Sequence, residues 1–264
     1  MKPINLTIWN EFVHEREAGP AGEWIRRIYP DGIHAFLADQ LAADDLTIRT
    51  ATLDEPGQGL PDEVLNTTDV LVWWGHCAHD RVDDALIERV RLRVLAGMGL
   101  IVLHSGHYSK IFRRLMGTGC RLRWREVGEK ERLWVVDPSH PIVAGVPETF
   151  MLPNSEMYGE PFELPDDGKI VFQSWYEGGN VVRSGVAFQR GAGKVFYFSP
   201  GHETYPIYHD ANIRKVIGNA VRWAKGTILP PRVTPQPEPS EPIRTENPLN
   251  NINTKELHRT QPAI

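Results

Sequence analysis

Cysteine is scarce in this chain of 264 residues, which contains only Cys77 and Cys120. Two isolated cysteines cannot build a disulfide framework or a zinc site of the thiolate type. Long apolar runs are also lacking, since no stretch approaches the ~18 residues of a membrane span. The first residues, MKPINLTIWNEF, carry no apolar signal-peptide core and instead predict a first strand. We therefore expect a cytoplasmic protein with reduced thiols and no membrane partner.

An excess of positive charge is lacking as well. The formal net charge is −5 and there is no long basic run, which argues against nucleic acid as a partner. Glycine-rich phosphate loops are missing, because Gly117–Gly119 and Gly191–Gly193 are short and lie outside a strand–loop–helix context. A nucleotide-binding dehydrogenase is thereby disfavoured. What remains is an ordinary globular composition, with 41% hydrophobic and 24% charged residues.

Short apolar runs alternate with amphipathic helical patterns and predict a parallel sheet. Buried parallel strands are expected at Ile4–Trp9, Val70–Trp74 and Leu100–His104, with a weaker candidate at Thr47–Leu53. Helices are expected at Gly32–Ala43, Asp83–Ala96, Ser109–Met116 and Asp210–Ala224. Alternation of this kind is typical of a doubly wound α/β sheet.

The pattern changes between about residues 120 and 198, where short β-like runs are separated by Pro, Gly and Asp. We interpret this region as an antiparallel β extension whose last run rejoins the main sheet. Its runs are Leu133–Val136, Lys169–Tyr176, Gly185–Gln189 and Lys194–Phe198. The α/β domain is then expected to span residues 1–226.

The remaining residues, 227–264, form a Pro-rich tail with eight prolines and few large apolar side chains. Such a tail cannot bury enough surface to fold alone. Extended Pro-rich chain advances about 3.1 Å per residue, so the tail is long enough to cross a subunit boundary. We therefore expect a homo-oligomer, most simply a dimer.

Histidines gather where the predicted strands end. Six of the ten histidines follow a strand: His14, His76, His79, His104, His107 and His202. A single histidine at a strand end is usually a surface residue or a capping partner. Because ligands of open α/β sheets bind beyond the carboxyl ends of the strands, however, four converging segments favour a shared metal or acid–base site. Imidazoles mixed with carboxylates suit transition metals better than Ca²⁺ or Mg²⁺.

Ser105 follows a strand in the way that a hydrolase nucleophile does. The pattern G-x-S-x-G is not met, because position 103 is Leu. A serine hydrolase therefore stays as an alternative.

The segment Glu156–Glu160 is interpreted as a loop that carries two carboxylates and the phenol of Tyr158, either at a site or as a solvated turn. Five tryptophans belong either to the core or to an aromatic wall that stacks on a sugar ring. They are Trp9, Trp73, Trp74, Trp134 and Trp175.

Long strings of this sequence resemble the ThuA family, the trehalose-utilisation proteins. The resemblance covers about residues 4–225, in segments such as WNEFVHE, DVLVWWGHCAHD, GMGLIVLHSGHYSKIFRRLMGT, SEMYGE and RGAGKVFYFSPGHETYP. It implies a flavodoxin-like fold, similar to that of class I glutamine amidotransferases. In that group a Cys nucleophile stands where this chain has His104, and a His-Pro-Glu motif stands near His202-Glu203. An imidazole cannot replace the thiolate, so glutamine amidotransferase activity is not expected.

The resemblance further implies a role in disaccharide catabolism beside sugar oxidoreductases that produce 3-keto-glycosides. A ketone at C3 acidifies the proton on C2, and a base with an oxyanion stabiliser can remove it. Elimination and isomerisation both follow from the resulting enediolate. A non-catalytic sugar-binding or regulatory partner of an oxidoreductase is the alternative.

On this interpretation we assign roles to the residues at the strand ends. The expected metal ion is Zn, Mn or Ni, held by His14, His104 and His202 with His107 or His76 as the fourth ligand. The expected catalytic groups are Glu156 or Glu11 as base, Tyr158 as proton donor, and Glu203. The expected substrate contacts are Trp9, Asn10, Trp74, His76, Ser105 and Tyr108.

Overall fold

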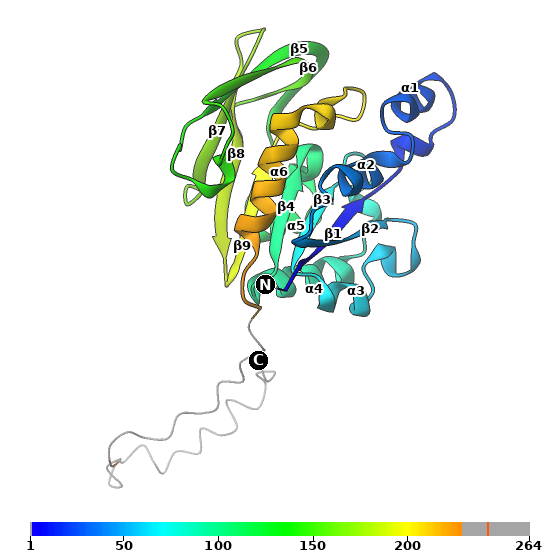
Figure 1. Cartoon of the computed structure of the whole chain (residues 1–264), viewed down its shortest axis with the longest axis vertical. Coiled ribbons are helices and arrows are strands. Elements are labelled where there is room, and N and C mark those ends of the chain that lie inside the picture. Colours follow the sequence, from blue (N-terminus) through cyan, green and yellow to red (C-terminus); the bar gives the residue numbers. More distant parts are fainter. Residues whose placement is uncertain (1, 229–241, 243–264) are drawn as a thin grey trace, which may run out of the picture. The chain divides into compact units, whose positions relative to one another are not determined.

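Nine strands form a single mixed sheet in the part of the chain that this computed structural model describes, residues 2–228 and residue 242 (Figure 1). The strand order is β2-β1-β3-β4-β9-β8-β7-β5-β6. The first five of these strands are parallel: β2 (Leu46–Thr52), β1 (Ile4–Asn10), β3 (Val70–Trp74), β4 (Gly99–Leu103) and β9 (Gly193–Phe198). Counting β9 as the fifth strand, this is the flavodoxin-like order 2-1-3-4-5. The predicted doubly wound α/β fold is confirmed.

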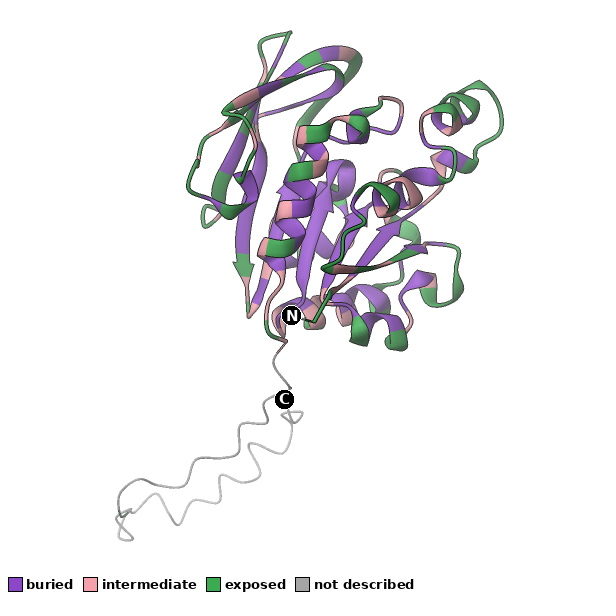
Figure 2. Ribbon diagram, in the orientation of Figure 1, coloured by how far each residue is buried: buried purple, intermediate pink, exposed green. Residues whose placement is uncertain are grey.

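Helices cover both faces of the parallel strands, because the central strands β3 and β4 are apolar and buried on both sides (Figure 2). On one face, α2 (Gly32–Gln40) and α6 (Ala211–Ala224) pack against the sheet, and α1 (Pro20–Ile28) lies at its end. On the other face lie α3 (Asp62–Thr67), α4 (Asp84–Leu95) and α5 (Lys110–Met116). Their caps follow from the sequence: the Asp210 side chain accepts hydrogen bonds from the first amides of α6, and Gly117 ends α5 in a left-handed conformation.

Short 3-10 turns occupy several loops at the ends of strands and helices. They are η1 (His14–Arg16), η2 (Pro56–Gly59), η3 (His79–Arg81), η4 (His104–Tyr108), η5 (Pro141–Val143) and η6 (Ile207–His209).

The antiparallel extension continues the same sheet through β8 (Val181–Arg190), β7 (Lys169–Tyr176), β5 (Arg123–Val135) and β6 (Thr149–Gly159). One expectation here was wrong. The segment Glu156–Glu160 is not a loop, because all but its last residue belong to the long strand β6. The polar stretch before Leu133 is also strand, since β5 exposes its outer face to solvent. The structure therefore places Glu156 and Tyr158 on a rigid element.

The Pro-rich tail lies almost wholly outside the described residues, so the predicted homo-oligomer stays a prediction. Cys77 and Cys120 are both free thiols, as the sequence indicated. Within residues 2–228 no helix combines the length and apolar character that crossing a membrane demands.

Candidate functional site

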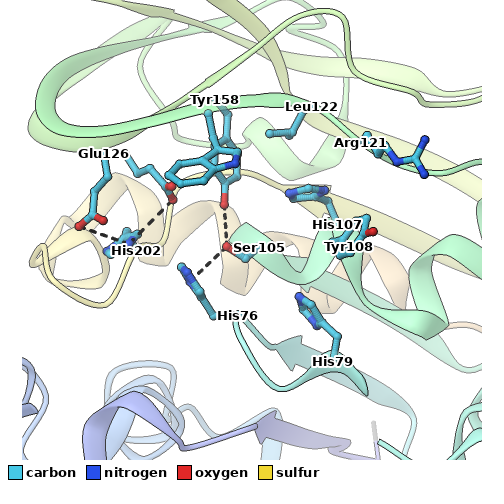
Figure 3. A pocket seen from close by; sticks show the side chains of 12 residues that line it. His76, His79, Ser105, His107, Tyr108, Arg121, Leu122, Glu126, Tyr158 and His202 are labelled. Carbon is cyan, nitrogen blue, oxygen red and sulfur yellow. Dashed lines mark hydrogen bonds and ion pairs between the residues drawn. The ribbon is translucent and has the colours of Figure 1, made fainter. Parts of the chain in front are cut away.

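A pocket of about 430 Å³ lies beyond the carboxyl ends of β3 and β4, with β5 and β6 along its other side (Figure 3). Its lining comprises His76, His79, Ser105, His107, Tyr108, Arg121, Leu122, Trp124, Glu126, Glu156, Tyr158 and His202. The parallel strands end in register, with Trp74 beside Leu103 and Leu103 beside Phe198. Loops that are distant in sequence therefore meet at one edge of the sheet, as the histidine pattern predicted.

His104 occupies the sharp turn between β4 and η4, with a φ of 51° that side chains rarely adopt. Its Nδ1–H donates to the carbonyl oxygen of Ser199 at 2.9 Å, which directs Nε2 towards Glu156 and the Tyr158 hydroxyl. The ring stacks on Tyr158, with centroids 4.9 Å apart and planes 6° apart. Gly201 permits this packing, because a Cβ there would lie 3.0 Å from the Cβ of His104.

Glu156 faces His104 from β6. Its Oε2 lies 3.0 Å from Nε2 of His104 and 3.9 Å from Nε2 of His202, yet no hydrogen-bond donor among the described residues satisfies this buried oxygen. Burial alone would raise the pKa of Glu156, but its contact with His104 and the nearby His202 and His76 hold that pKa below its usual range. The carboxyl group is therefore ionised at neutral pH.

Hydroxyl groups connect His104 to His76. The Tyr158 hydroxyl lies 3.3 Å from Nε2 of His104 and 2.6 Å from Oγ of Ser105, and Oγ lies 3.2 Å from Nδ1 of His76. Each of these hydroxyl and imidazole groups can donate or accept, so the three contacts form one continuous hydrogen-bonded chain from His76 to His104. Burial raises the pKa of Tyr158 well above its usual value, so the phenol keeps its proton. This chain can hold or pass a proton beside Glu156.

His202 follows β9 and is neutral, because burial lowers its pKa to about 4. Its Nδ1 accepts from the backbone N–H of Thr204 at 3.2 Å and lies 2.7 Å from the Thr204 hydroxyl oxygen. With the proton on Nε2, the ring directs it towards Glu126 and Glu156, at 3.6 and 3.9 Å. With the proton on Nδ1, the hydrogen bond from the Thr204 backbone N–H is lost, the ring donates to the Thr204 hydroxyl, and Nε2 is free to bind a cation. His202 can therefore serve either as a donor or as a ligand.

An ion pair between the partly buried His14 and the buried Glu203 lies next to His76. His14 contacts Glu203 through Nδ1 and Oε1 at 2.5 Å, and Glu203 Oε2 lies 3.3 Å from Nδ1 of His76. Hydrogen bonding to Cys77 and to Glu203 raises the pKa of His14 to about 11. Burial opposes ionisation of Glu203, but His14 and His76 hold its pKa well below the usual range. Glu203 is thus a carboxylate that orients His76.

Two groups of side chains within the described residues offer the spacing that a metal ion needs. In each group, one donor atom per residue lies within 4.8 Å of the others. The first group is His76, His104 and His202, whose ring centroids are 5.1 to 5.6 Å apart. The second group is His14, His76 and Glu203. The predicted ligands His14, His104 and His202 therefore do not form one set, and His76 is the residue common to both.

His107 lies outside both groups, although it was expected as a possible fourth ligand. Its Nδ1–H donates to the carbonyl oxygen of Cys120 at 2.7 Å, and burial lowers its pKa to about 3. The ring lines the pocket as a neutral acceptor (Figure 3).

Four predicted site residues lie in the interior rather than at the pocket. Trp9 and Trp74 are at most 1% exposed, and their indole N–H groups donate to the backbone carbonyls of Gln58 and Gly201. The sequence alone could not distinguish core tryptophans from tryptophans that stack on a sugar ring, because both kinds occur in or next to apolar strands. Trp9 and Trp74 are therefore core residues and not the substrate contacts that were expected.

Asn10 and Glu11 are also buried and already paired. The Asn10 amide donates to Glu15 at 2.7 Å. The two carboxylate oxygens of Glu11 accept from the backbone amides of Cys77 and Ala78, at 2.8 and 3.0 Å. Glu11 thus anchors the loop that carries His76, and Glu156 remains as the base candidate. Tyr108 and Ser105 line the pocket as expected.

Four lining residues were missed by the sequence analysis: Arg121, Leu122, Trp124 and Glu126. They precede or begin β5, a strand whose polar pattern gave no strand signal. The only available signal was the string WREVGEKERLWVV, which forms part of the family resemblance.

Comparison with known proteins decides the family. The sequence profile of the ThuA family, described as trehalose utilisation, matches residues 5–224. This chain belongs to the ThuA family. The matched stretch contains every side chain of the pocket, so the site lies within the ThuA domain. No curated protein gives a match.

Solved structures of the same fold include two ThuA-like proteins. The one from Bacteroides uniformis has 16% identity and a TM-score of 0.60, covering 84% of this chain and 92% of that chain. The one from Parabacteroides merdae has 15% identity and a TM-score of 0.60, covering 88% and 93%. A cytoplasmic protein from Salmonella typhimurium LT2 has 14% identity and a TM-score of 0.56, covering 85% and 100%. At these identities the likeness shows the ThuA fold alone.

Proposed function

We propose that this ThuA-family protein is a sugar-catabolic enzyme that removes the C2 proton of a 3-keto-glycoside. The observation that carries the proposal is the position of Glu156, an ionised and buried carboxylate whose Oε2 has no hydrogen-bond donor among the described residues. It borders a pocket whose lining includes four histidines, two tyrosines and a second glutamate. An ionised carboxylate that accepts no hydrogen bond at one oxygen is suited to accept a proton from carbon. The family's link to trehalose utilisation supports a sugar substrate.

The side chains of the pocket account for each proton and electron pair that moves in this reaction. Glu156 takes the C2 proton, and the electron pair of the C–H bond moves into the C2–C3 bond as the C3 carbonyl becomes an enediolate oxygen. In the elimination, that pair returns to form the C3 ketone and a C1–C2 double bond, while the C1–oxygen bond breaks. The leaving oxygen takes a proton, which the Tyr158–Ser105 chain can deliver. In the isomerisation, the enediolate is instead reprotonated on carbon.

The three imidazoles of His76, His104 and His202 fit a divalent transition metal such as Zn, Mn or Ni. The Nδ1–H of His104 is fixed by a carbonyl oxygen and His76 is oriented by Glu203, in the way that ligand histidines are held. A cation held there would supply positive charge for the enediolate oxygen. Glu156 lies beside this group and is free to act as base.

The alternatives receive less support from the geometry. Ser105 has a histidine within 3.2 Å, but Oγ is also 2.6 Å from the Tyr158 hydroxyl. Glu203 contacts the same Nδ1 of His76 that faces Oγ, whereas the acid of a catalytic triad contacts the other ring nitrogen. A non-catalytic sugar-binding partner would not require an unpartnered buried carboxylate. Since the keto group must come from oxidation of a glycoside, we place a sugar oxidoreductase before this enzyme. A cytoplasmic location stays part of the proposal.

Incubation with 3-keto-trehalose, followed by mass spectrometry and NMR, tests the proposed function. Cleavage to two six-carbon products or a shift of the keto group is the expected result. An unchanged substrate, with protein that has been loaded with Zn, Mn or Ni, would contradict the enzyme assignment. The matched control is Trp175→Ala, on the outer face of β7 away from the pocket.

A further inference from the structure

The pocket contains more than the acid–base groups. Its buried part carries Ser105, Glu156, Tyr158 and His202. Its exposed part carries Tyr108, Arg121 and Trp124, of which Trp124 is 66% exposed. In Figure 3, Arg121 and Tyr108 lie on the side of the pocket opposite His202 and Glu126. The proposed chemistry uses none of the exposed residues.

Trp124 is held next to the reacting groups by strand register. It pairs with Tyr158 across β5 and β6, and paired residues of antiparallel strands project from the same face with Cβ atoms about 5 Å apart. A tryptophan in that position gives the pocket a flat apolar surface beside a phenol. The apolar face of a pyranose ring stacks on such a surface while its hydroxyls remain available for hydrogen bonds.

Arg121 and Tyr108 supply polar groups near this surface. Within residues 2–228 the guanidinium of Arg121 has no hydrogen bond or ion pair, since the Glu163 carboxylate accepts only from the Arg121 backbone N–H, at 3.4 Å. The guanidinium of Arg113 lies 4.4 Å from the centre of the Tyr108 ring and covers one side of it. Tyr108 is therefore fixed in place, while Arg121 presents a fork of free donors that suits vicinal hydroxyls.

We propose that Trp124, Arg121 and Tyr108 form a second sugar subsite, which holds the ring on the far side of the scissile bond. The substrate class is then a keto-disaccharide rather than a free keto-monosaccharide. A pocket of about 430 Å³ exceeds the space that one six-carbon ring needs. This inference rests on the proposed function for the identity of the reacting ring, but binding at the subsite is separable from turnover.

Calorimetric titration of the full-length protein with trehalose and with glucose tests the subsite without requiring turnover. We expect Trp124→Ala to weaken trehalose binding roughly tenfold, as loss of an aromatic contact does, and Arg121→Ala to weaken it to a smaller extent. Glucose binding by both variants should match the unmodified protein. Trp175→Ala, which removes an exposed tryptophan from β7, should leave both affinities within about twofold of the unmodified protein.

Three results would overturn the subsite. The first is that Trp124→Ala binds trehalose as tightly as Trp175→Ala does, and the second is that Trp124→Ala loses as much affinity for glucose as for trehalose. The third is that the unmodified protein shows no saturable binding of trehalose. The kinetic arm uses 3-keto-trehalose, for which Trp124→Ala should raise KM with little change in kcat. If the protein binds trehalose through Trp124 and turns over no keto-sugar, the subsite stands and the proposed function fails. If it turns over keto-sugars with a KM that is independent of Trp124, the proposed function stands and the subsite fails.

Discussion

Nε2 of His104 and Oε2 of Glu156 lie 3.0 Å apart in the buried part of the pocket, and Oε2 has no hydrogen-bond donor among the described residues. The contact joins the turn after β4 to a strand of the antiparallel extension. Neither the parallel strands nor the antiparallel extension carries all the residues of the site. The candidate site of this ThuA-family protein therefore depends on both parts of the sheet.

Glu156→Gln tests the base directly. Glutamine keeps the shape of the side chain but cannot take a proton, so we expect kcat to fall by about 10²–10⁴-fold with little loss of stability. Turnover of 3-keto-trehalose and thermal unfolding are the two measurements. Activity within threefold of the unmodified enzyme would exclude Glu156 as the base.

The proposed metal site predicts which histidines are needed for metal binding. His104→Ala should lower the affinity for Zn or Mn at least about tenfold, because it removes a ligand and not merely a supporting contact. His107→Asn is the matched control, since His107 lies outside both histidine groups. Elemental analysis of protein purified without a histidine tag measures the occupancy. Full occupancy in His104→Ala, or equal loss in both variants, would refute the ligand assignment.

Ser105→Ala separates the proposed enzyme from a serine hydrolase. As a member of a hydroxyl chain, Ser105 should contribute less than about tenfold to kcat, whereas a nucleophile contributes about 10³-fold or more. Steady-state kinetics with 3-keto-trehalose gives the answer. A near-complete loss, together with a trapped acyl or glycosyl adduct on Ser105, would restore the hydrolase alternative.

The ion pair of His14 and Glu203 should make stability depend on pH. The folded-state pKa of His14 is raised from 6.5 to about 11, so its stabilisation is fully present below pH 6.5 and is lost as pH rises towards 11. Glu203 has a depressed pKa, so its stabilisation is present above its ordinary value of 4.5 and is lost as pH falls below it. The pair is thus strongest between about pH 4.5 and 6.5.

His14→Gln is the variant that tests this pH dependence. Denaturant unfolding from pH 6 to pH 9 should show that the unmodified protein loses more free energy of unfolding over this interval than His14→Gln does. Parallel curves for the two proteins would show that His14 is not charged in the folded state.

The sequence predicted the parallel half of the fold well because its signals are local. Val70–Trp74 is an unbroken apolar run, and the structure gives β3 the same bounds. The turn at His104 could also be located, since it follows such a run directly. The histidines after these strands converge because the parallel strands end together, which is a consequence of topology that the alternating pattern already implies.

The antiparallel half was harder to predict, since β5 and β6 carry many polar side chains on a face open to solvent. For this reason Glu156 was expected in a loop and Trp124 was not expected at all. The site predictions for Trp9 and Glu11 were wrong for another reason, because burial and long-range pairing leave no mark on the local sequence. Trp9 pairs with a backbone group 49 residues away, and Glu11 with backbone groups 66 and 67 residues away.

Exchange of the C2 proton in deuterated water tests the central claim most directly, because it reports proton removal whether elimination or isomerisation follows. With 3-keto-trehalose in D₂O, the metal-loaded enzyme should place deuterium at C2 of recovered substrate or at C3 of an isomerised 2-keto product, and an elimination product should lack the C2 hydrogen, as NMR and mass spectrometry detect. Glu156→Gln should reduce the rate of incorporation at least about 10²-fold. Cleavage of the glycosidic bond with the original C2 proton fully retained would contradict the account.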